Sequence, residues 1–194
     1  MSISQKENYR GKLSDKRLDK RAAQVSSILY FGRSSSVQIT MTEAEQKAAH
    51  RFLSNEKVEE KILIDTAKER SSYLCEGKEV LVIQDTTEIN LDNHRNRIER
   101  GTGIGLRGNN EDLGFFLHGS LVLDAHSETC QGFSDIQLWH RDEDKEDKQQ
   151  RDYKKLPIEE KESYKWIKAC LQSKQHLSKG CICYIYRRQR RRHI

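Results

Sequence analysis

Asp85 is the residue whose position in this sequence most suggests chemistry. It follows the apolar run VLVIQ, which predicts a buried strand. We therefore expect its carboxylate at the carboxyl end of a central strand, where α/β sheets bind ligands. Hard cations such as Mg²⁺ prefer carboxylate oxygens but need several of them together. The alternative interpretation is that DTT forms a turn or a cap and that Asp85 has no chemical role.

Three other segments contain residue types that occur at active sites, and each has a simpler explanation. His118 lies in an apolar run, which favours a hydrogen-bonded core histidine over a catalytic base. The glycine-rich stretch 101–108 neither follows a strand nor opens a helix, so we expect a hairpin connection there and no phosphate-binding loop. The acidic run 142–147 contains Lys145 and is followed by Lys148, which is typical of a solvated loop.

Positive charge gathers at both ends of the sequence. The formal net charge is +5, and between residues 6 and 33 eight lysines and arginines face only three acids. The tail RRQRRRHI adds five arginines at residues 187–192. Such clusters favour contacts with the phosphates of nucleic acids. Four arginines of the N-terminal part are candidate DNA contacts, with a merely solvated surface position as the alternative for each: Arg17, Arg21, Arg33 and Arg51.

The rest of the composition argues against a disulfide-stabilised or membrane-spanning protein. The five cysteines are odd in number and form no C-x-x-C pair, so neither a disulfide framework nor a zinc site is indicated. No run approaches the roughly 18 to 20 apolar residues that cross a bilayer. We expect a soluble cytoplasmic protein with reduced thiols and no membrane partner.

Helical periodicity dominates residues 1–76. Apolar residues recur at steps of three and four from residue 15 to residue 29, which predicts a first helix. Thr42 and Glu45 form a capping-box pattern ahead of a second helix, and a third is predicted at 58–74. We expect these helices to form a small N-terminal domain.

From residue 77 the pattern changes to that of an α/β domain, expected to extend to residue 186. The run 80–83 predicts a strand that is buried on both faces. Two further runs, 114–125 and 132–141, predict strands that pair with it in antiparallel fashion. A fourth strand, CICYIY, follows a helical segment, which gives a sheet with one crossover connection.

The helical segment between the third and fourth strands is predicted to begin at Pro157, because proline suits the first turn of a helix. Its apolar positions are expected to face the sheet: Ile158, Trp166, Ile167, Cys170 and Leu171.

Four segments together resemble a known family. VLVIQDTT, GFFLHGSLVLDA, GFSDIQLWHR and EKESYKW occur in the order and approximate spacing seen in bacterial cut-and-paste transposases. The resemblance is to the hairpin-forming insertion-sequence family whose best-known member mobilises a composite kanamycin-resistance transposon. The segments LSDKRLDKR and AAHRFLSNEKVEEKIL resemble the DNA-end-binding domain of that family, so the resemblance covers roughly the whole chain.

The resemblance implies a ribonuclease H-like catalytic domain that follows a helical domain for binding transposon ends. In this family two aspartates and a glutamate hold two Mg²⁺ ions for the cleavage and transfer of DNA strands. Asp85 matches the first of these carboxylates, with Thr86 and Thr87 beside it. The second aspartate of the family follows a strand in a pattern like G-D-R-E-x-D-I, and its glutamate comes much later on a helix.

The sequence departs from the family after CICYIY, where RRQRRRHI stands in place of the second aspartate motif. Codons for RRQRRRHI can be chosen so that the bases, read one position back, encode IGDREGDI, which is the missing motif. We therefore expect residues 187–194 to be an out-of-frame tail on a truncated chain that does not bind Mg²⁺ productively. Incompatible codons between Tyr184 and Ile194 in the gene would exclude this frameshift.

Three functional hypotheses remain at this point. The chain is a catalytically incomplete N-terminal fragment of a transposase, with end-binding helices and Asp85. Alternatively, it is a non-catalytic DNA-binding inhibitor that competes for transposon ends or pairs with full-length transposase. In the third hypothesis it is a small basic protein whose arginine tail binds nucleic acid without sequence preference.

Overall fold

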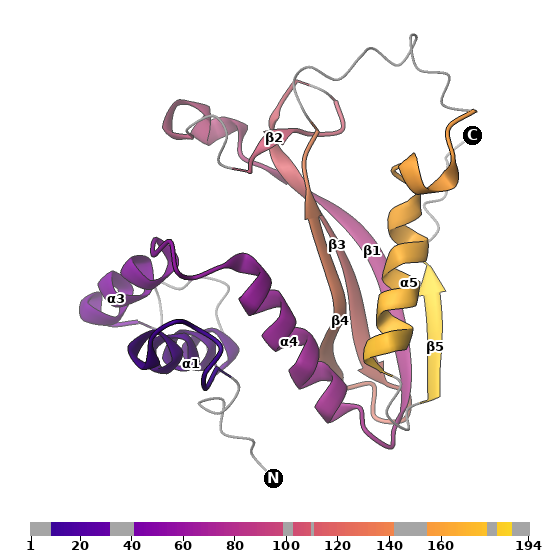
Figure 1. The fold of residues 1–194 in the computed structure, drawn as a ribbon, viewed down its shortest axis with the longest axis horizontal. Coiled ribbons are helices and arrows are strands. Elements are labelled where there is room, and N and C mark those ends of the chain that lie inside the picture. The colour runs from indigo at the N-terminus through magenta and orange to yellow at the C-terminus, as the bar shows by residue number, and fades with distance from the viewer. Residues whose placement is uncertain are drawn as a thin grey trace. The chain divides into compact units, whose positions relative to one another are not determined.

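The chain divides into two units, residues 1–70 and 71–194, each with its own hydrophobic core (Figure 1). Helices form the first unit, and a mixed five-stranded sheet with one long helix forms most of the second. The structure is a computed structural model. It describes residues 9–31, 41–98, 103–109, 111–141, 155–177 and 182–187.

Three helices belong to the first unit: α1 (Lys16–Phe31), α3 (Glu43–Leu53) and α4 (Glu60–Leu74), the last of which extends into the second unit. The helices predicted from periodicity in this part of the chain are confirmed to within two residues at each end. No helix within the described ranges is both long and apolar enough to cross a membrane.

The capping box predicted before α3 is present. The Thr42 hydroxyl accepts a hydrogen bond from the Glu45 amide at 3.3 Å, and the Glu45 carboxylate accepts one from the Thr42 amide at 2.8 Å. Each bond satisfies an amide that has no partner within the helix. The charge–dipole interaction at this end of the helix also favours the acid, and the hydrogen bonds from Thr42 lower the pKa of Glu45.

Removal of this cap should weaken the first unit. Thr42→Ala is expected to lower the free energy of unfolding by about 1 kcal/mol, the usual effect of losing an N-cap side chain. Urea denaturation followed by far-UV circular dichroism measures the change. Thr42→Ser keeps the hydroxyl and serves as the control, so equal losses in both variants would contradict the role of the cap.

The core of the first unit combines small and medium apolar residues with two aromatic ones. The buried members are Tyr9, Leu13, Ala22, Ala23, Val25, Met41, Ala49 and Phe52. Partly buried residues of α1, α4 and the α3–α4 connection pack against them: Leu18, Val58, Ile62 and Leu63. The apolar face predicted for the first helix is thus confirmed at its described positions Leu18, Ala22 and Val25.

The sheet of the second unit contains β1 (Glu79–Asn90), β2 (Gly105–Leu106), β3 (Leu113–Asp124), β4 (Cys130–Trp139) and β5 (Ile182–Arg187). The neighbours β1 and β3 are antiparallel, as are β3 and β4, while β5 is parallel to β1. The short β2 pairs with the first residues of β3. The predicted antiparallel strands and the crossover to a fourth strand are therefore confirmed, with one additional short strand.

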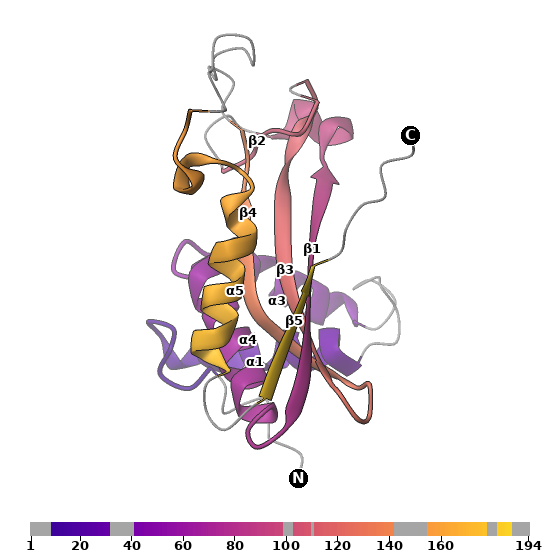
Figure 2. The same cartoon turned by 90° about the vertical axis from the view of Figure 1, so that its right-hand side faces the viewer.

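β1 differs from the predicted strand in length and burial. It runs to Asn90, and burial alternates along it: Val80, Val82 and Gln84 are buried, whereas Leu81 and Ile83 are half-buried. The prediction of a strand buried on both faces is wrong. The reason is that α5 (Tyr164–His176) lies against one face of the sheet (Figure 2), so one side of β1 is covered more completely than the other.

The helical segment before β5 also differs from its prediction. Pro157 precedes a short 3₁₀ turn, η3 (Ile158–Glu160), Lys161 has an extended backbone, and α5 begins only at Tyr164. Of the five residues expected to face the sheet, Ile158, Ile167 and Leu171 are 43%, 45% and 56% exposed. Trp166 and Cys170 are half-buried, and Trp166 contacts His118 on β3, so the prediction is confirmed for Trp166. The buried residues of α5 are Ala169 and Ser173.

The contact between α5 and the sheet is partly polar, and this explains why apolar periodicity misplaced the helix face. The hydroxyls of Ser134 and Ser173 are 2.8 Å apart, and both residues are fully buried. Gln137 donates to the carbonyl of Lys165 at 3.2 Å. Residues that pack close to a sheet through hydrogen bonds give no apolar signal in the sequence.

Candidate functional site

The first two turns of α1 have a basic face. Lys16, Arg17 and Lys20 are exposed and Arg21 is half-buried. With 3.6 residues per turn, the four side chains span an arc of about 140° on the helix. The opposite side of α1 carries buried residues of the core. We call these four residues the basic face of α1.

The single acid of α1 points away from this face. Asp19 is buried, and its carboxylate accepts hydrogen bonds from the amides of Gly11 at 2.6 Å and Leu13 at 3.0 Å. Gly11 has a φ of 73°, a left-handed conformation that glycine adopts without strain. Since Asp19 is used to hold the turn before the helix, α1 contributes no carboxylate to its basic face.

Three of the four arginines predicted to contact DNA lie among the described residues. Arg17 and Arg21 lie one turn apart on the basic face of α1, and Arg51 is exposed in the last turn of α3. Arg33 lies outside the described residues. The sequence analysis did not include Lys16 and Lys20 among the candidates, although their i, i+4 spacing with each other and their proximity to Arg17 would have revealed them.

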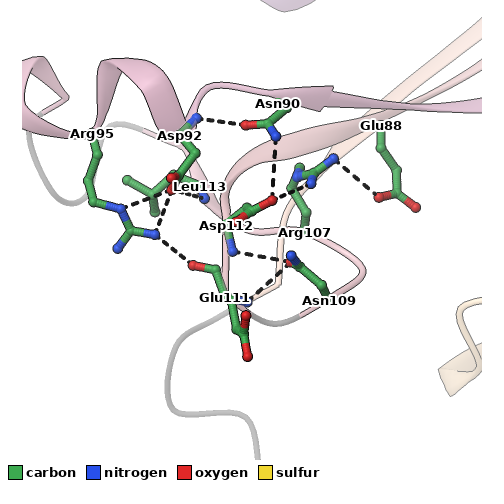
Figure 3. A network of polar contacts seen from close by, with 9 residues as sticks. All are labelled: Glu88, Asn90, Asp92, Arg95, Arg107, Asn109, Glu111, Asp112 and Leu113. Atoms are coloured by element: carbon green, nitrogen blue, oxygen red, sulfur yellow. Dashed lines mark hydrogen bonds and ion pairs between the residues drawn. The ribbon is translucent and has the colours of Figure 1, made fainter.

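Arginines at the far end of β1 are engaged with acids (Figure 3). Asp92 accepts from Arg95 Nε at 2.9 Å, and this bond is the main cause of its lowered pKa. Arg107 pairs with Asp112 and lies 3.6 Å from Glu88. The Arg107 pairs attach the glycine-rich stretch to β1 and to the residue before β3, whereas the Arg95–Asp92 pair is local. Both guanidinium groups are thus engaged. This end of the sheet is therefore a poor candidate for phosphate binding.

Asp85 is in the interior of β1. The predicted position at the carboxyl end of the strand is wrong, because β1 continues for five further residues. It is the cross-strand partner of Gly119 on β3, and it is half-buried. Its Oδ1 accepts a hydrogen bond from the Thr86 amide at 2.9 Å. Because side chains alternate along a strand, Asp85 lies on the face opposite the buried Gln84 and hence opposite α5.

The carboxylate of Asp85 does not by itself fit a two-metal site. Such a site requires several oxygen ligands that converge on each Mg²⁺ ion. In the part of the chain that the structure describes, no three or more histidine, cysteine, aspartate or glutamate side chains gather in a way that suits a metal ion. The described residues thus supply one candidate ligand of the expected three.

His118 is a core residue, as the sequence analysis expected. It is fully buried, and its Nδ1 lies 2.9 Å from the Thr86 hydroxyl. Its ring packs edge-on against Trp166, with 4.5 Å between ring centroids. Burial and then the positive charge of Lys165 lower the pKa of His118, while the charges of Asp135 and Asp85 oppose this shift.

The lowered pKa makes the stability of the second unit depend on pH. Unfolded histidine takes up a proton near pH 6.5, but the folded chain does so only at lower pH. The free energy of unfolding should therefore fall as the pH falls below about 6.5, with a slope from this residue of at most about 1.4 kcal/mol per pH unit. Urea denaturation at pH 7.5, 6.5 and 5.5, followed by tryptophan fluorescence, measures the slope. His118→Phe should have a smaller slope, and an unchanged one would refute the assignment.

A comparison with known families bears on the N-terminal part of the chain. Residues 1–58 match the transposase DNA-binding family. The matched range includes α1 with its basic face and α3 with Arg51, and it ends before α4. It spans less than a third of the chain. The match supports a transposase-like DNA-binding role for the N-terminal part, and DNA is the partner that it suggests.

The EKESYKW segment, one of the transposase-like motifs, attaches α5 to the sheet. Glu162 forms an ion pair of 2.8 Å with Arg141, which follows β4. Although burial raises the pKa of Glu162, the hydrogen bond and charge of Arg141 hold it below its ordinary value. The Lys165 ammonium lies 4.7 Å from the ring centroid of Trp139, and Trp166 contacts His118. Three residues of the motif thus contact the sheet or the residue that follows it.

Proposed function

We propose that this chain is a transposase-like protein that binds the ends of a transposon through its N-terminal unit. The observation that carries the proposal is the basic face of α1, which lies within the range that matches transposase DNA-binding domains. Four positive charges on one helix face suit the phosphates of a DNA duplex. A rigid helix that is held by a buried core presents them in a fixed arrangement.

Selection of bound DNA tests this proposal directly. The full chain is mixed with a pool of duplexes that contain 30 randomised base pairs, and bound molecules are amplified and sequenced over several rounds at 150 mM salt. An end-binding protein should enrich one related set of sequences. Binding without any enriched sequence would exclude the end-binding function, and it would favour the small basic nucleic-acid-binding protein of the third hypothesis.

For the second unit we propose the N-terminal part of a ribonuclease H-like domain of the DDE transposase type. Two features support this. The antiparallel strands β1, β3 and β4 are followed by α5 and then by β5, which is parallel to β1. Asp85 lies in the interior of β1, between β3 and β5 in the sheet. After β5, where the family has the motif of its second aspartate, the sequence has RRQRRRHI instead. The proposed state is therefore a catalytically incomplete chain, which can act as an inhibitor by occupying transposon ends or by pairing with full-length transposase.

Catalytic incompleteness has a simple test. We expect no cleavage of DNA that carries the selected sequence when the full chain is incubated with Mg²⁺ or Mn²⁺. A sequencing gel with end-labelled duplex detects single cuts. Cleavage that is present in the unmodified chain and absent in Asp85→Ala would show that Asp85 acts in a complete site, and it would overturn this part of the proposal.

A further inference from the structure

On β3, the residue opposite Asp85 has no side chain on the face where Asp85 lies. Its cross-strand partner is Gly119, which has no side chain to hold the carboxylate. A Cβ added at Gly119 would lie 3.1 Å from Cε1 of Phe133, so this position leaves little room for a larger residue. On the other face of the sheet, β3 contacts the residue that follows Asp85.

His118 lies on that other face and contacts the residue that determines where the carboxylate points. It is the cross-strand partner of Thr86, and its Nδ1 is 2.9 Å from the Thr86 hydroxyl. Thr86 in turn donates its amide hydrogen to Oδ1 of Asp85 at 2.9 Å. One buried ring thus holds the side chain of Thr86, whose amide binds the carboxylate of Asp85.

The ring of His118 is itself fixed by α5. Its plane is inclined by 78° to that of Trp166, which lies in the first turn of the helix. Glu162 and Lys165 attach the same end of the helix through Arg141 and Trp139. Because buried side chains are closely packed, the ring cannot turn without displacement of Trp166.

We propose that His118 is a positioning residue, which fixes the orientation of the Asp85 carboxylate through Thr86 and depends on α5 for its own position. The inference rests on the proposed function only in that it takes Asp85 as the first carboxylate of the family. His118 does not contact the face on which that carboxylate lies. A carboxylate that is already held by hydrogen bonds needs little reorganisation when a ligand binds.

Nuclear magnetic resonance of the full chain, labelled with ¹³C and ¹⁵N, tests this relay. In His118→Phe a flat ring remains against Trp166, but the bond to Thr86 is lost. We expect the Asp85 carboxyl carbon and the Thr86 amide to change chemical shift. The Thr86 amide should also exchange about fivefold faster, which corresponds to the loss of about one hydrogen bond. Thr86→Val removes the same bond from the other side and should move the Asp85 carboxyl signal in the same direction.

Controls separate positioning from a general loss of packing. His118→Asn keeps a polar atom near the place of Nδ1 and should restore most of the Asp85 shift. Ser134→Ala removes a different buried hydrogen bond under α5 and should leave Asp85 and Thr86 unchanged. The double variant His118→Phe with Thr86→Val should change the Asp85 signal no more than either single variant does.

An Asp85 carboxyl signal that stays in place in both His118→Phe and Thr86→Val would overturn the proposal. If His118→Phe does not fold, the Asp85 carboxyl signal in Thr86→Val, alone and combined with His118→Asn, still tests the proposal. DNA binding measured on the same samples keeps the two ideas apart. Absence of DNA binding in the unmodified chain would refute the proposed function, whereas the Asp85 and Thr86 signals report on the relay alone.

Discussion

Neutralising the basic face of α1 should weaken DNA binding by roughly 100-fold at moderate salt, since each lost phosphate contact removes about one released counterion. The variant changes four residues to glutamine: Lys16, Arg17, Lys20 and Arg21. Glutamine keeps the helix propensity of the segment, so the fold should survive. The slope of log affinity against log salt concentration should fall by about 3 to 4 units, at about 0.9 per contact. Fluorescence anisotropy with the selected duplex, at salt concentrations from 50 to 300 mM, measures both quantities.

The C-terminal tail supplies a control of equal charge. Deleting residues 188–194 removes four arginines, the same number of charges as the α1 variant removes. If α1 forms the interface, this deletion should change the salt slope by less than about one unit. The opposite pattern, with binding lost on deletion of the tail and retained in the α1 variant, would mean that the tail binds nucleic acid and that the first unit does not.

Local signals in the sequence were sufficient for the elements of the first unit. Its helices are amphipathic, and the cap at Thr42 and Glu45 is a short-range pattern that does not depend on the rest of the fold. The basic face of α1 follows from the same periodicity. What the sequence did not reveal is the role of Asp19. Its carboxylate folds back onto the turn at Gly11 and Leu13, which depends on backbone conformation rather than on residue type.

Non-local packing explains the errors in the second unit. The end of β1 was misplaced because residues 85–90 are polar except for Ile89. Their strand conformation depends on pairing with β3, from Gly119 back to Gly114. The buried face of α5 was misplaced because Ser134, Ser173 and His118 form a polar layer where apolar residues were expected. Both errors affect the surroundings of Asp85. For this reason, the sequence identified the residue itself but not the position of its carboxylate in the strand.

Truncation of Phe52 should unfold the first unit and leave the second one folded. Phe52 is 4% exposed in the core that α1 and α3 share, and Phe→Ala changes at such positions cost about 3 to 5 kcal/mol. A unit of this size seldom has more than about 3 to 5 kcal/mol of stability from its core. Phe52→Ala should therefore lose much of the helical circular dichroism and nearly all specific DNA binding.

Tryptophan fluorescence reports on the second unit alone, because Trp139 and Trp166 both belong to it. Their fluorescence should show the same urea midpoint in Phe52→Ala as in the unmodified chain. The neighbouring Leu53 is 61% exposed, so Leu53→Ala should change stability by no more than about 0.5 kcal/mol. A shift of the tryptophan midpoint in Phe52→Ala would mean that the two units unfold together. DNA binding would then depend on the sheet as well as on α1, and the basic face could not act as an independent module.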